Sequence, residues 1–140
     1  MNLVFVDTGA WLAIAVKRDQ YHKRAAAYYQ HLSSQNVRLL TTNYALVETY
    51  TRIRYDDGHA KAVSFREILS RAVEQDKLFV EWITPELHEE AWSIFQSYSD
   101  QEFSIVDCAS FVVAQRARVD EVFGFDKGFI TMGFNLRPPR

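Results

Sequence analysis

The stretch Ser99–Val113, SDQEFSIVDCASFVV, joins a polar, acidic segment to a helix that is apolar almost all round. Ser104 is a favourable N-cap residue, and Asp107 falls at the third helical position, among the N–H groups that have no partner inside the helix. Because nearly every side of this helix is apolar, most of it is expected inside the fold. Asp107 is therefore predicted either to line a polar pocket at the edge of the core or to form only a capping box with Ser104.

The composition limits the classes of protein that fit the chain. Its 140 residues are 48% hydrophobic and 24% charged, with a net charge of -2, which predicts one folded domain, residues 1–140, rather than a disordered chain. This charge gives no overall attraction to nucleic acid, so RNA binding would need local basic groups and metal ions. One cysteine, Cys108, excludes an intramolecular disulfide. With no signal-peptide pattern and no membrane-spanning run, the sequence predicts a soluble, cytoplasmic protein.

The first sixteen residues, MNLVFVDTGAWLAIAV, are typical of a strand, a turn and a helix. Residues 2–6 favour β structure, and helical spacing begins near Ala10, after Asp7-Thr8-Gly9. A nearly continuous apolar strand is typical of the middle of a parallel sheet, where ligands bind beyond the carboxyl ends of the strands. Asp7 is therefore a candidate ligand-site residue, or simply the N-cap of the helix.

A second strand and helix follow the same order. The sequence predicts a strand over residues 37–41 and a helix over about 44–55, which Thr42 or Asn43 can cap. Glu48 lies one turn into this helix, so it is either a surface residue or a neighbour of Asp7 in the same cleft. The residues 56–58, Asp-Asp-Gly, predict a turn with two ordinary loop acids.

The rest of the chain continues this alternation. Helices are predicted over residues 21–34, 59–75 and 85–98, strands over 77–83 and 119–125, and an edge strand over 134–137. Pro85 suits the first position of its helix. Asp126 follows the strand over 119–125, as either a turn residue or a further acid of the cleft.

Four acids, Asp7, Glu48, Asp107 and Asp126, are thus assigned to strand ends or to the first turns of helices. No phosphate-binding loop, dinucleotide glycine pattern, zinc spacing or nucleophile elbow competes with them. Carboxylates that share a cleft repel one another unless a cation neutralises them. Ligands that are all oxygen atoms indicate Mg²⁺ or Mn²⁺.

Four segments carry a resemblance to a known family. In chain order, VDTGAWLA, TTNYALVETYTRI, FSIVDCASFVVA and FGFDKGF surround the four acids. A chain with these segments in this order resembles a PIN-domain ribonuclease and is similar to the VapC-type toxins of toxin–antitoxin pairs. The resemblance implies a three-layer α/β fold with a central parallel sheet flanked by helices. It also implies a metal-dependent endoribonuclease that hydrolyses RNA phosphodiester bonds, held in check by a small antitoxin protein.

The resemblance assigns roles to the matching residues. Asp7, supported by Thr8, and Asp107 would be the direct metal ligands, while Glu48 and Asp126 would complete the catalytic pocket, directly or through water. Asp100 and Glu102 lie near its entrance but match the pattern less specifically. Gly124 departs from the pattern, because many relatives carry a hydroxyl residue two positions before the last acid, and this leaves the role of Asp126 open.

Two interaction surfaces are expected. Phosphate contacts could come from basic residues around the cleft, although no compact patch is visible in the sequence; these residues are Lys17, Arg18, Lys23, Arg24, Arg52, Arg54 and Lys127. A homodimer is predicted from apolar residues on the early helices that exceed what one small sheet can cover; these are Tyr28, Tyr29, Phe65, Ile68 and Leu69.

Three other readings remain open at this point. The same acidic site would serve an RNA-processing nuclease that has no antitoxin. A receiver-like phosphoacceptor module also combines an α/β sheet with clustered acids, although here the first strand ends in a single aspartate, and Glu48 replaces the aspartate that would be phosphorylated. In a catalytically silent binding module, all four acids would be helix caps or surface residues.

Overall fold

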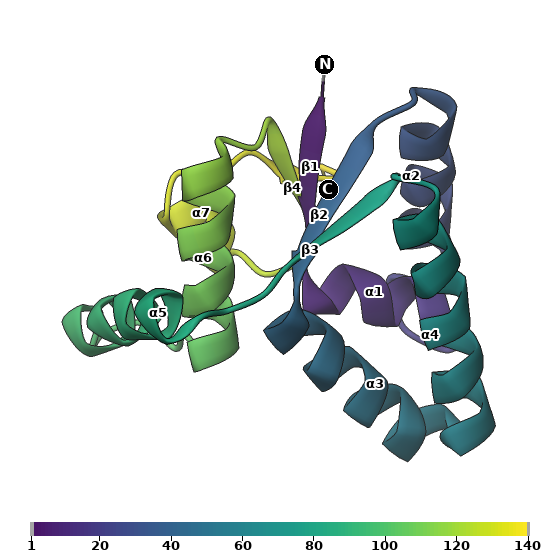
Figure 1. Ribbon diagram of the computed structural model, residues 1–140, viewed down its shortest axis with the longest axis horizontal. Helices are drawn as coiled ribbons and strands as arrows, with labels where there is room; N and C mark the ends of the chain where they lie inside the picture. Colours follow the sequence, from purple (N-terminus) through teal and green to yellow (C-terminus); the bar gives the residue numbers. More distant parts are fainter. Residues whose placement is uncertain (1, 140) are drawn as a thin grey trace.

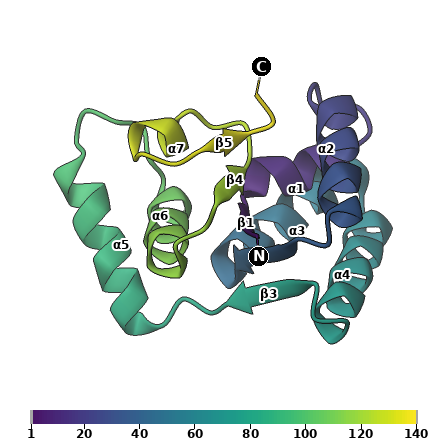
Figure 2. The ribbon, with the colours of Figure 1, turned by 90° about the horizontal axis from the view of Figure 1, so that it is seen from above.

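The computed structural model describes residues 2–139, over which five parallel strands alternate with seven helices (Figure 1). The strands are β1 (Leu3–Val6), β2 (Arg38–Thr42), β3 (Leu78–Glu81), β4 (Glu121–Phe123) and β5 (Leu136–Arg137), in the spatial order β3-β2-β1-β4-β5. The helices are α1 (Thr8–Ala15), α2 (His22–Ser34), α3 (Asn43–Asp57), α4 (His59–Glu74), α5 (Pro85–Ser97), α6 (Ile105–Ala117) and α7 (Gly128–Thr131). Helices α1 to α4 cover one face of the sheet and α5 to α7 the other (Figure 2). The predicted three-layer α/β fold is confirmed.

The central strand β1 is buried on both faces. It pairs in parallel with β2 on one side and with β4 on the other. Val4 and Val6 face the core beneath α1 to α4, while Phe5 faces the core beneath α5 to α7. A strand covered on both faces needs apolar side chains at consecutive positions, which explains the run LVFV. Asp7 therefore leaves the sheet at its most buried strand end.

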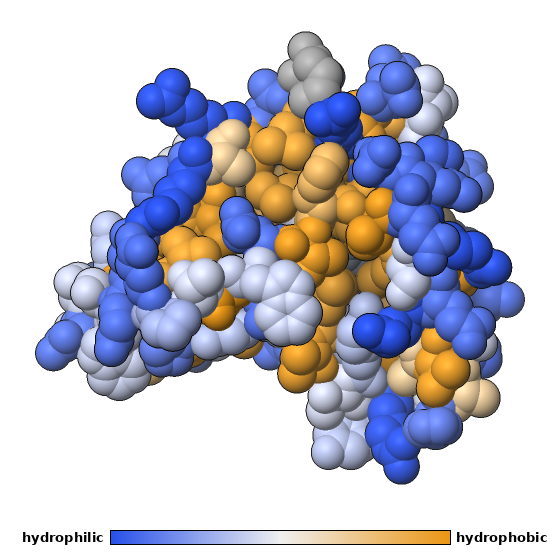
Figure 3. All heavy atoms as spheres, viewed as in Figure 1, coloured by the Kyte–Doolittle hydropathy of each residue, from blue (hydrophilic) through white to orange (hydrophobic). Residues whose placement is uncertain are grey.

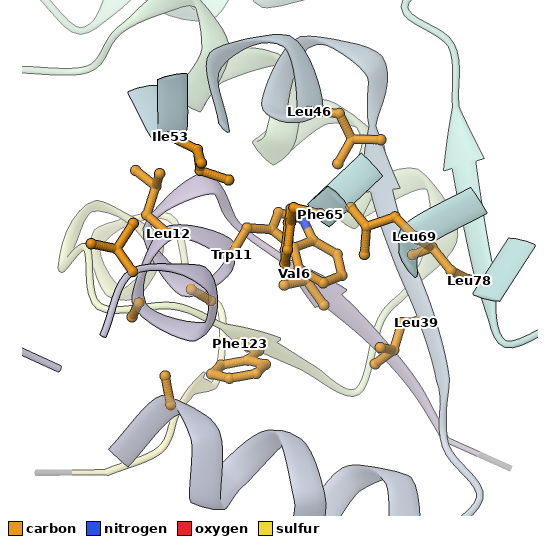
Figure 4. Close-up of a cluster of buried hydrophobic side chains, with 14 of the residues drawn as sticks. Val6, Trp11, Leu12, Leu39, Leu46, Ile53, Phe65, Leu69, Leu78 and Phe123 are labelled. Atoms are coloured by element: carbon orange, nitrogen blue, oxygen red, sulfur yellow. The ribbon is translucent and has the colours of Figure 1, made fainter. Parts of the chain in front are cut away.

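In the first core, Trp11 of α1 contacts both helix α4 and strand β2 (Figure 4). The Trp11 ring packs edge-on against Phe65 of α4, with centroids 6.1 Å apart. Trp11 Nε1 donates to Thr41 Oγ1 at 3.1 Å, and this hydroxyl donates to the carbonyl of Val6 at 3.0 Å. A buried indole N–H needs such a partner, and the contacts fix α1 against the ends of β1 and β2.

The second core contains most of α6, as predicted. Phe111 lies between Phe103 and Phe129, with ring centroids 4.9 and 5.0 Å away. Residues 108–114 are all buried, including the free Cys108. Among residues 2–139, neither α6 nor any other helix combines the length and the apolar character needed to cross a membrane.

Several element boundaries were predicted correctly and others were wrong. Thr42 caps α3 and Thr84 caps α5, as predicted. The turn predicted at residues 56–58 is instead the end of α3, which continues to Asp57 and stops at Gly58, where φ is +98°. Asp57 is not a plain loop acid, because it pairs with Arg18 at 3.2 Å. Long-range contacts of this kind extend a helix beyond its local signals.

The carboxyl-terminal elements also differ from the prediction. Strand β4 covers only residues 121–123, because the N–H of Val119 still bonds to Ala114 of α6. The four-residue helix α7 was not predicted, since one turn is too short to show a helical period. The edge strand β5 was correctly placed within residues 134–137.

The residues from which a homodimer was predicted lie mostly inside the molecule. Phe65 and Leu69 are buried in the first core, Tyr28 and Tyr29 are half-buried against it, and Ile68 is exposed. The amphipathic stripes of α2 and α4 are used to cover the sheet. Exposed apolar side chains, Val47 and Trp82 among them, instead border a groove of about 790 Å³ between α3, α4 and β3. Figure 3 shows apolar surface in the middle of this face.

Candidate active site

The four predicted acids gather at the carboxyl end of the sheet. Asp7 follows β1 and Asp126 follows β4, while Glu48 lies in the second turn of the helix that follows β2. Parallel strands place their carboxyl ends at one edge. Helix α6 runs back toward the start of β4, so its first turn, with Asp107, lies at this same edge (Figure 1).

Asp7 forms the floor of the site. Asp7 is only 4% exposed, and its backbone N–H donates to the carbonyl of Phe123 at 3.0 Å. It occupies the N-cap position of α1, but its side chain makes no capping hydrogen bond. Burial, followed by the charge of Asp107, raises its pKa to about 7, and the N–H groups of Thr8 and Gly9 oppose only part of this rise. The N-cap alternative therefore does not account for the buried carboxylate.

Asp107 does act as a helix cap. Its N–H donates to Ser104 Oγ at 3.0 Å, and the N–H of Ser104 donates to Asp107 Oδ2 at 2.9 Å. Both bonds of the predicted capping box are present. Burial nevertheless raises the pKa of Asp107, the hydrogen bond from Ser104 opposes this, and the charges of Asp126 and Glu48 add to the rise. The carboxylate is thus both a cap and a member of the acidic cluster.

Asp126 lies on the exposed rim, in the turn that leads to α7. Its Oδ1 accepts a hydrogen bond from the N–H of Gly128 at 2.8 Å. A Cβ at residue 128 would stand 2.9 Å from the ring of Phe103, so only glycine lets this turn pack against the segment that leads into α6. The charge of Asp126 raises the pKa of both Asp7 and Asp107, which shows that the turn brings it to the same cluster.

Glu48 is half-buried and approaches the cluster from the side of α3. The start of α3 is fixed by a hydrogen bond from the N–H of Ala45 to Thr42 Oγ1 at 3.0 Å. Thr8 Oγ1 donates to the carbonyl of Ala45 at 3.5 Å. The hydroxyl of Thr8 therefore joins the start of α1 to α3, while its backbone N–H faces Asp7.

Gly124 has a steric role that the sequence did not reveal. A Cβ at this residue would stand 3.2 Å from the Cβ of Asp7, closer than side chains normally pack. The hydroxyl residue of many relatives has no room here unless Asp7 moves. The sequence shows only that a glycine lies two residues before a candidate acid. The structure shows that this glycine packs against Asp7.

Oxygen atoms dominate the donor set of the site. Within residues 2–139, no three His, Cys, Asp or Glu side chains stand close enough together to enclose a metal ion. Mg²⁺ is often held by one or two carboxylates together with water and substrate phosphates. Burial raises the pKa of the Cys108 thiol to about 11, so it offers no thiolate. The site therefore fits a hard divalent cation.

Two further acids lie outside this cluster. Asp100 and Glu102 are exposed, in the segment between α5 and α6. Of the basic residues considered for phosphate contacts, Arg18 is paired with Asp57, whereas Lys127 directly follows Asp126. The structure thus assembles the four predicted acids and leaves these two outside.

The sequence matches the PIN domain family over residues 4–135. The chain belongs to this family. It is 31% identical over 137 residues, 97% of this chain and 99% of the relative, to the 23S rRNA-specific endonuclease VapC20 of Mycobacterium tuberculosis. The resemblance to VapC-type proteins that the four segments indicated is thereby confirmed.

Solved structures agree with this assignment. The crystal structure of Mycobacterium tuberculosis VapC20, described as a Sarcin-Ricin loop cleaving toxin, has a TM-score of 0.79 and 29% identity, and the match covers 94% of this chain and 95% of that one. VapBC2 from Rickettsia felis, bound to a DNA fragment from its promoter, has a TM-score of 0.70 at 11% identity, covering 96% of this chain and 97% of that one. The second likeness concerns the fold alone.

Proposed function

We propose that this protein is an endoribonuclease that hydrolyses RNA phosphodiester bonds with Mg²⁺ or Mn²⁺, and that it is the toxin of a type II toxin–antitoxin pair. One observation carries the proposal: Asp7 is a buried carboxylate without a capping hydrogen bond, and Asp107 and Asp126 add negative charge beside it. Such an arrangement is costly in an empty site and favourable around a cation. The likeness to a 23S rRNA-specific endonuclease supports RNA as the substrate.

Two of the four acids would bind the cation, and the other two would bind water. Asp7 and Asp107 would hold the cation, which supplies charge neutralisation at the scissile phosphate and activation of the attacking water. Glu48 and Asp126 would hold and orient water by accepting its hydrogen bonds. The dipole of the first turn of α6 favours a phosphate at this edge.

The same observation argues against a silent binding module. In such a module the acids would be explained as caps or surface groups. Asp7 is buried, and although it occupies the N-cap position of α1, its side chain makes no capping hydrogen bond. An RNA-processing nuclease without an antitoxin would share the whole site. The gene next to this one discriminates the two, because a toxin is expected beside an open reading frame for a small DNA-binding protein.

The test of the metal mechanism compares three proteins on RNA. The native protein is expected to cut RNA with Mg²⁺ or Mn²⁺ and to lose this activity in excess chelator. The Asp107→Asn variant keeps an oxygen that accepts the capping hydrogen bond, so it is expected to fold and to cut at background level. The matched control, Glu67→Gln, changes an exposed acid on α4 and should cut like the native protein.

Two results would contradict this mechanism. One is undiminished cleavage in excess chelator by material free of other nucleases. The other is an Asp107→Asn variant that melts lower without metal, keeps its full Mg²⁺-induced stabilisation and still cuts RNA, because that behaviour belongs to a helix cap alone. Sequencing of RNA ends after induced expression would identify the target.

We also propose two protein partners, a small antitoxin and a second copy of this chain. VapC20 of Mycobacterium tuberculosis is described as a toxin, which supports a partner antitoxin. The exposed apolar groove between α3, α4 and β3 offers a surface for association. Copurification with the product of the neighbouring gene tests the first partner. A monomer by light scattering across micromolar concentrations would contradict the second.

A further inference from the structure

We propose that a pocket beside the acidic site, between the start of α2 and the turn after β4, binds one unpaired RNA nucleotide next to the bond that is cut. This inference rests on the proposed ribonuclease function. The pocket measures about 290 Å³, and its walls include Tyr21, Arg24, Phe125 and Lys127. It therefore combines aromatic rings with two cations.

The aromatic wall suits a nucleobase. The rings of Tyr21 and Phe125 are stacked, 4.3 Å apart and 5° from parallel, and both residues are half-buried. Successive bases stack on aromatic faces of this kind in proteins that bind single strands, because every base has a flat π face. A half-buried stacked pair on the wall of a pocket is thus a platform for one more flat ring.

Arg24 lies beside this stack. Its guanidinium carbon lies 5.9 Å from the centroid of Tyr21 and 5.6 Å from that of Phe125. A group equidistant from two stacked rings lies beside the pair. The carbonyls of Pro138 and Pro139 accept hydrogen bonds from its Nη2 at 3.5 and 2.6 Å. The guanidinium is therefore fixed at the side of the stack, where a planar cation can face a phosphate or a base edge.

The pocket adjoins the acidic site at Gly124. Gly124 lines it, and a Cβ at this residue would stand 3.2 Å from the Cβ of Asp7. Gly124 therefore touches both the pocket and the floor of the site. The next residues of the same turn are Phe125 in the pocket, Asp126 on the rim and Lys127 in the pocket. A nucleotide in the pocket would have its phosphate near the acids.

The charges favour RNA over an uncharged ligand. The protein has a net charge of -2, yet Arg24 and Lys127 both line this small pocket, which adjoins the acidic site at Gly124. Cations beside an acidic site compensate the repulsion that a phosphate backbone would meet there. Apolar walls from Ile130, Leu136 and the two prolines complete the pocket and exclude water from a bound base.

The experiment measures binding of a short single-stranded RNA that the native protein cuts, in the Asp107→Asn background so that no cleavage interferes. The RNA is used intact and as a series in which each member lacks one base. We expect one position next to the cut at which loss of the base weakens binding about 5- to 150-fold, the range for a stacked base. Phe125→Leu should cause the same loss with intact RNA, and no further loss with the RNA that lacks this base.

Two further variants complete the design. Phe79→Leu is the matched control, because Phe79 is an exposed aromatic with Arg38 over its ring, 5.6 Å away, on the edge strand β3; it should bind every RNA like the parent. Lys127→Gln changes an exposed side chain, so it tests the pocket even if Phe125→Leu fails to fold. Weaker binding with a smaller dependence on salt is expected for it.

The outcomes separate the pocket from the nuclease. If the native protein cuts RNA, but Phe125→Leu and Lys127→Gln bind the whole RNA series like the parent, the nucleotide pocket is overturned and the nuclease stands. The aromatic pair would then serve only the fold. If the native protein neither binds nor cuts any RNA with Mg²⁺, both proposals are overturned.

Discussion

The floor and the rim of the acidic site hold the same chemical group in opposite surroundings. Asp7, on the floor, is 4% exposed, and burial and neighbouring charges raise its pKa to about 7. Asp126, on the rim, is exposed and satisfied by the N–H of Gly128. An acid on the rim costs the fold little, so its position alone indicates little about function. A carboxylate on the floor is costly to bury, and that cost makes it informative.

Replacing the floor carboxylate should have the largest effect on activity. In Asp7→Asn we expect cleavage to fall by about a hundredfold or more, since even residues outside the metal contacts often cost 10- to 100-fold. The metal-free variant should unfold at the same temperature or higher at neutral pH, because a buried charge and its repulsion are removed. Cleavage assays and thermal melts on the same samples check this. A variant that melts lower and cuts normally would return Asp7 to a purely structural role.

The pH dependence of stability should distinguish floor from rim next. Between about pH 4 and 7, the folded protein keeps a proton on Asp7 that the unfolded chain has lost, because the folded pKa of about 7 lies above the ordinary value of 3.8. The free energy of unfolding of the metal-free protein should therefore fall as the pH rises through this window, by an amount on the order of a few kcal/mol. Asp107 contributes in the same direction.

Urea unfolding of the metal-free protein at several pH values measures this effect. The control is Asp7→Asn, whose stability should change less with pH because the floor no longer titrates. If the two proteins show the same pH profile, the raised pKa of Asp7 is refuted, whatever the absolute stabilities are.

A rim substitution should have a smaller effect. Asp126→Asn keeps an oxygen that accepts the N–H of Gly128, so the turn is preserved. We expect cleavage to fall by about tenfold and the free energy of unfolding to change by less than about 0.5 kcal/mol, as for most surface substitutions. A loss of activity as large as that of Asp7→Asn would contradict this prediction and make Asp126 as important for cleavage as Asp7.

The smallest change is a single methyl group pressed against the floor. In Gly124→Ala the new Cβ would stand 3.2 Å from the Cβ of Asp7. We expect a loss of about 1 kcal/mol in stability from overpacking, with a few-fold loss of cleavage as Asp7 shifts. Gly133→Ala meets no atom within 4 Å but has a φ of +89°, so it should cost stability through backbone strain and leave cleavage unchanged. Equal activity losses in both variants would contradict the steric role of Gly124.

Local patterns predicted much of this fold. The apolar run of β1 is what a buried strand needs, and the apolar turns of α6 are what a buried helix needs. The capping residues Thr42 and Thr84 mark where helices begin. Four acids at such positions were therefore enough to predict which side chains gather at one edge of the sheet.

Features set by distant contacts could not be predicted in this way. The last turn of α3 is extended where Arg18 reaches Asp57. The apolar stripe of α4 predicted either a core contact or a dimer contact, because the sequence does not show which helix covers the sheet; Phe65 lies in the core. The close contact of Gly124 with Asp7 joins residues more than a hundred positions apart. Each depends on the packing of elements that no local pattern describes.

The capping box at the start of α6 has a consequence for ligand binding. The N–H of Ser104 holds Asp107 Oδ2 at 2.9 Å, so this side chain loses its rotational freedom when the helix forms. The side chain therefore loses its conformational entropy when the protein folds, and not when a cation binds. Helix start and ligand preorganisation are thus one event. A Ser104→Ala change would remove the hydroxyl that accepts from the N–H of Asp107, but it would keep the backbone N–H that holds the carboxylate, so it should weaken the helix start and leave Asp107 oriented.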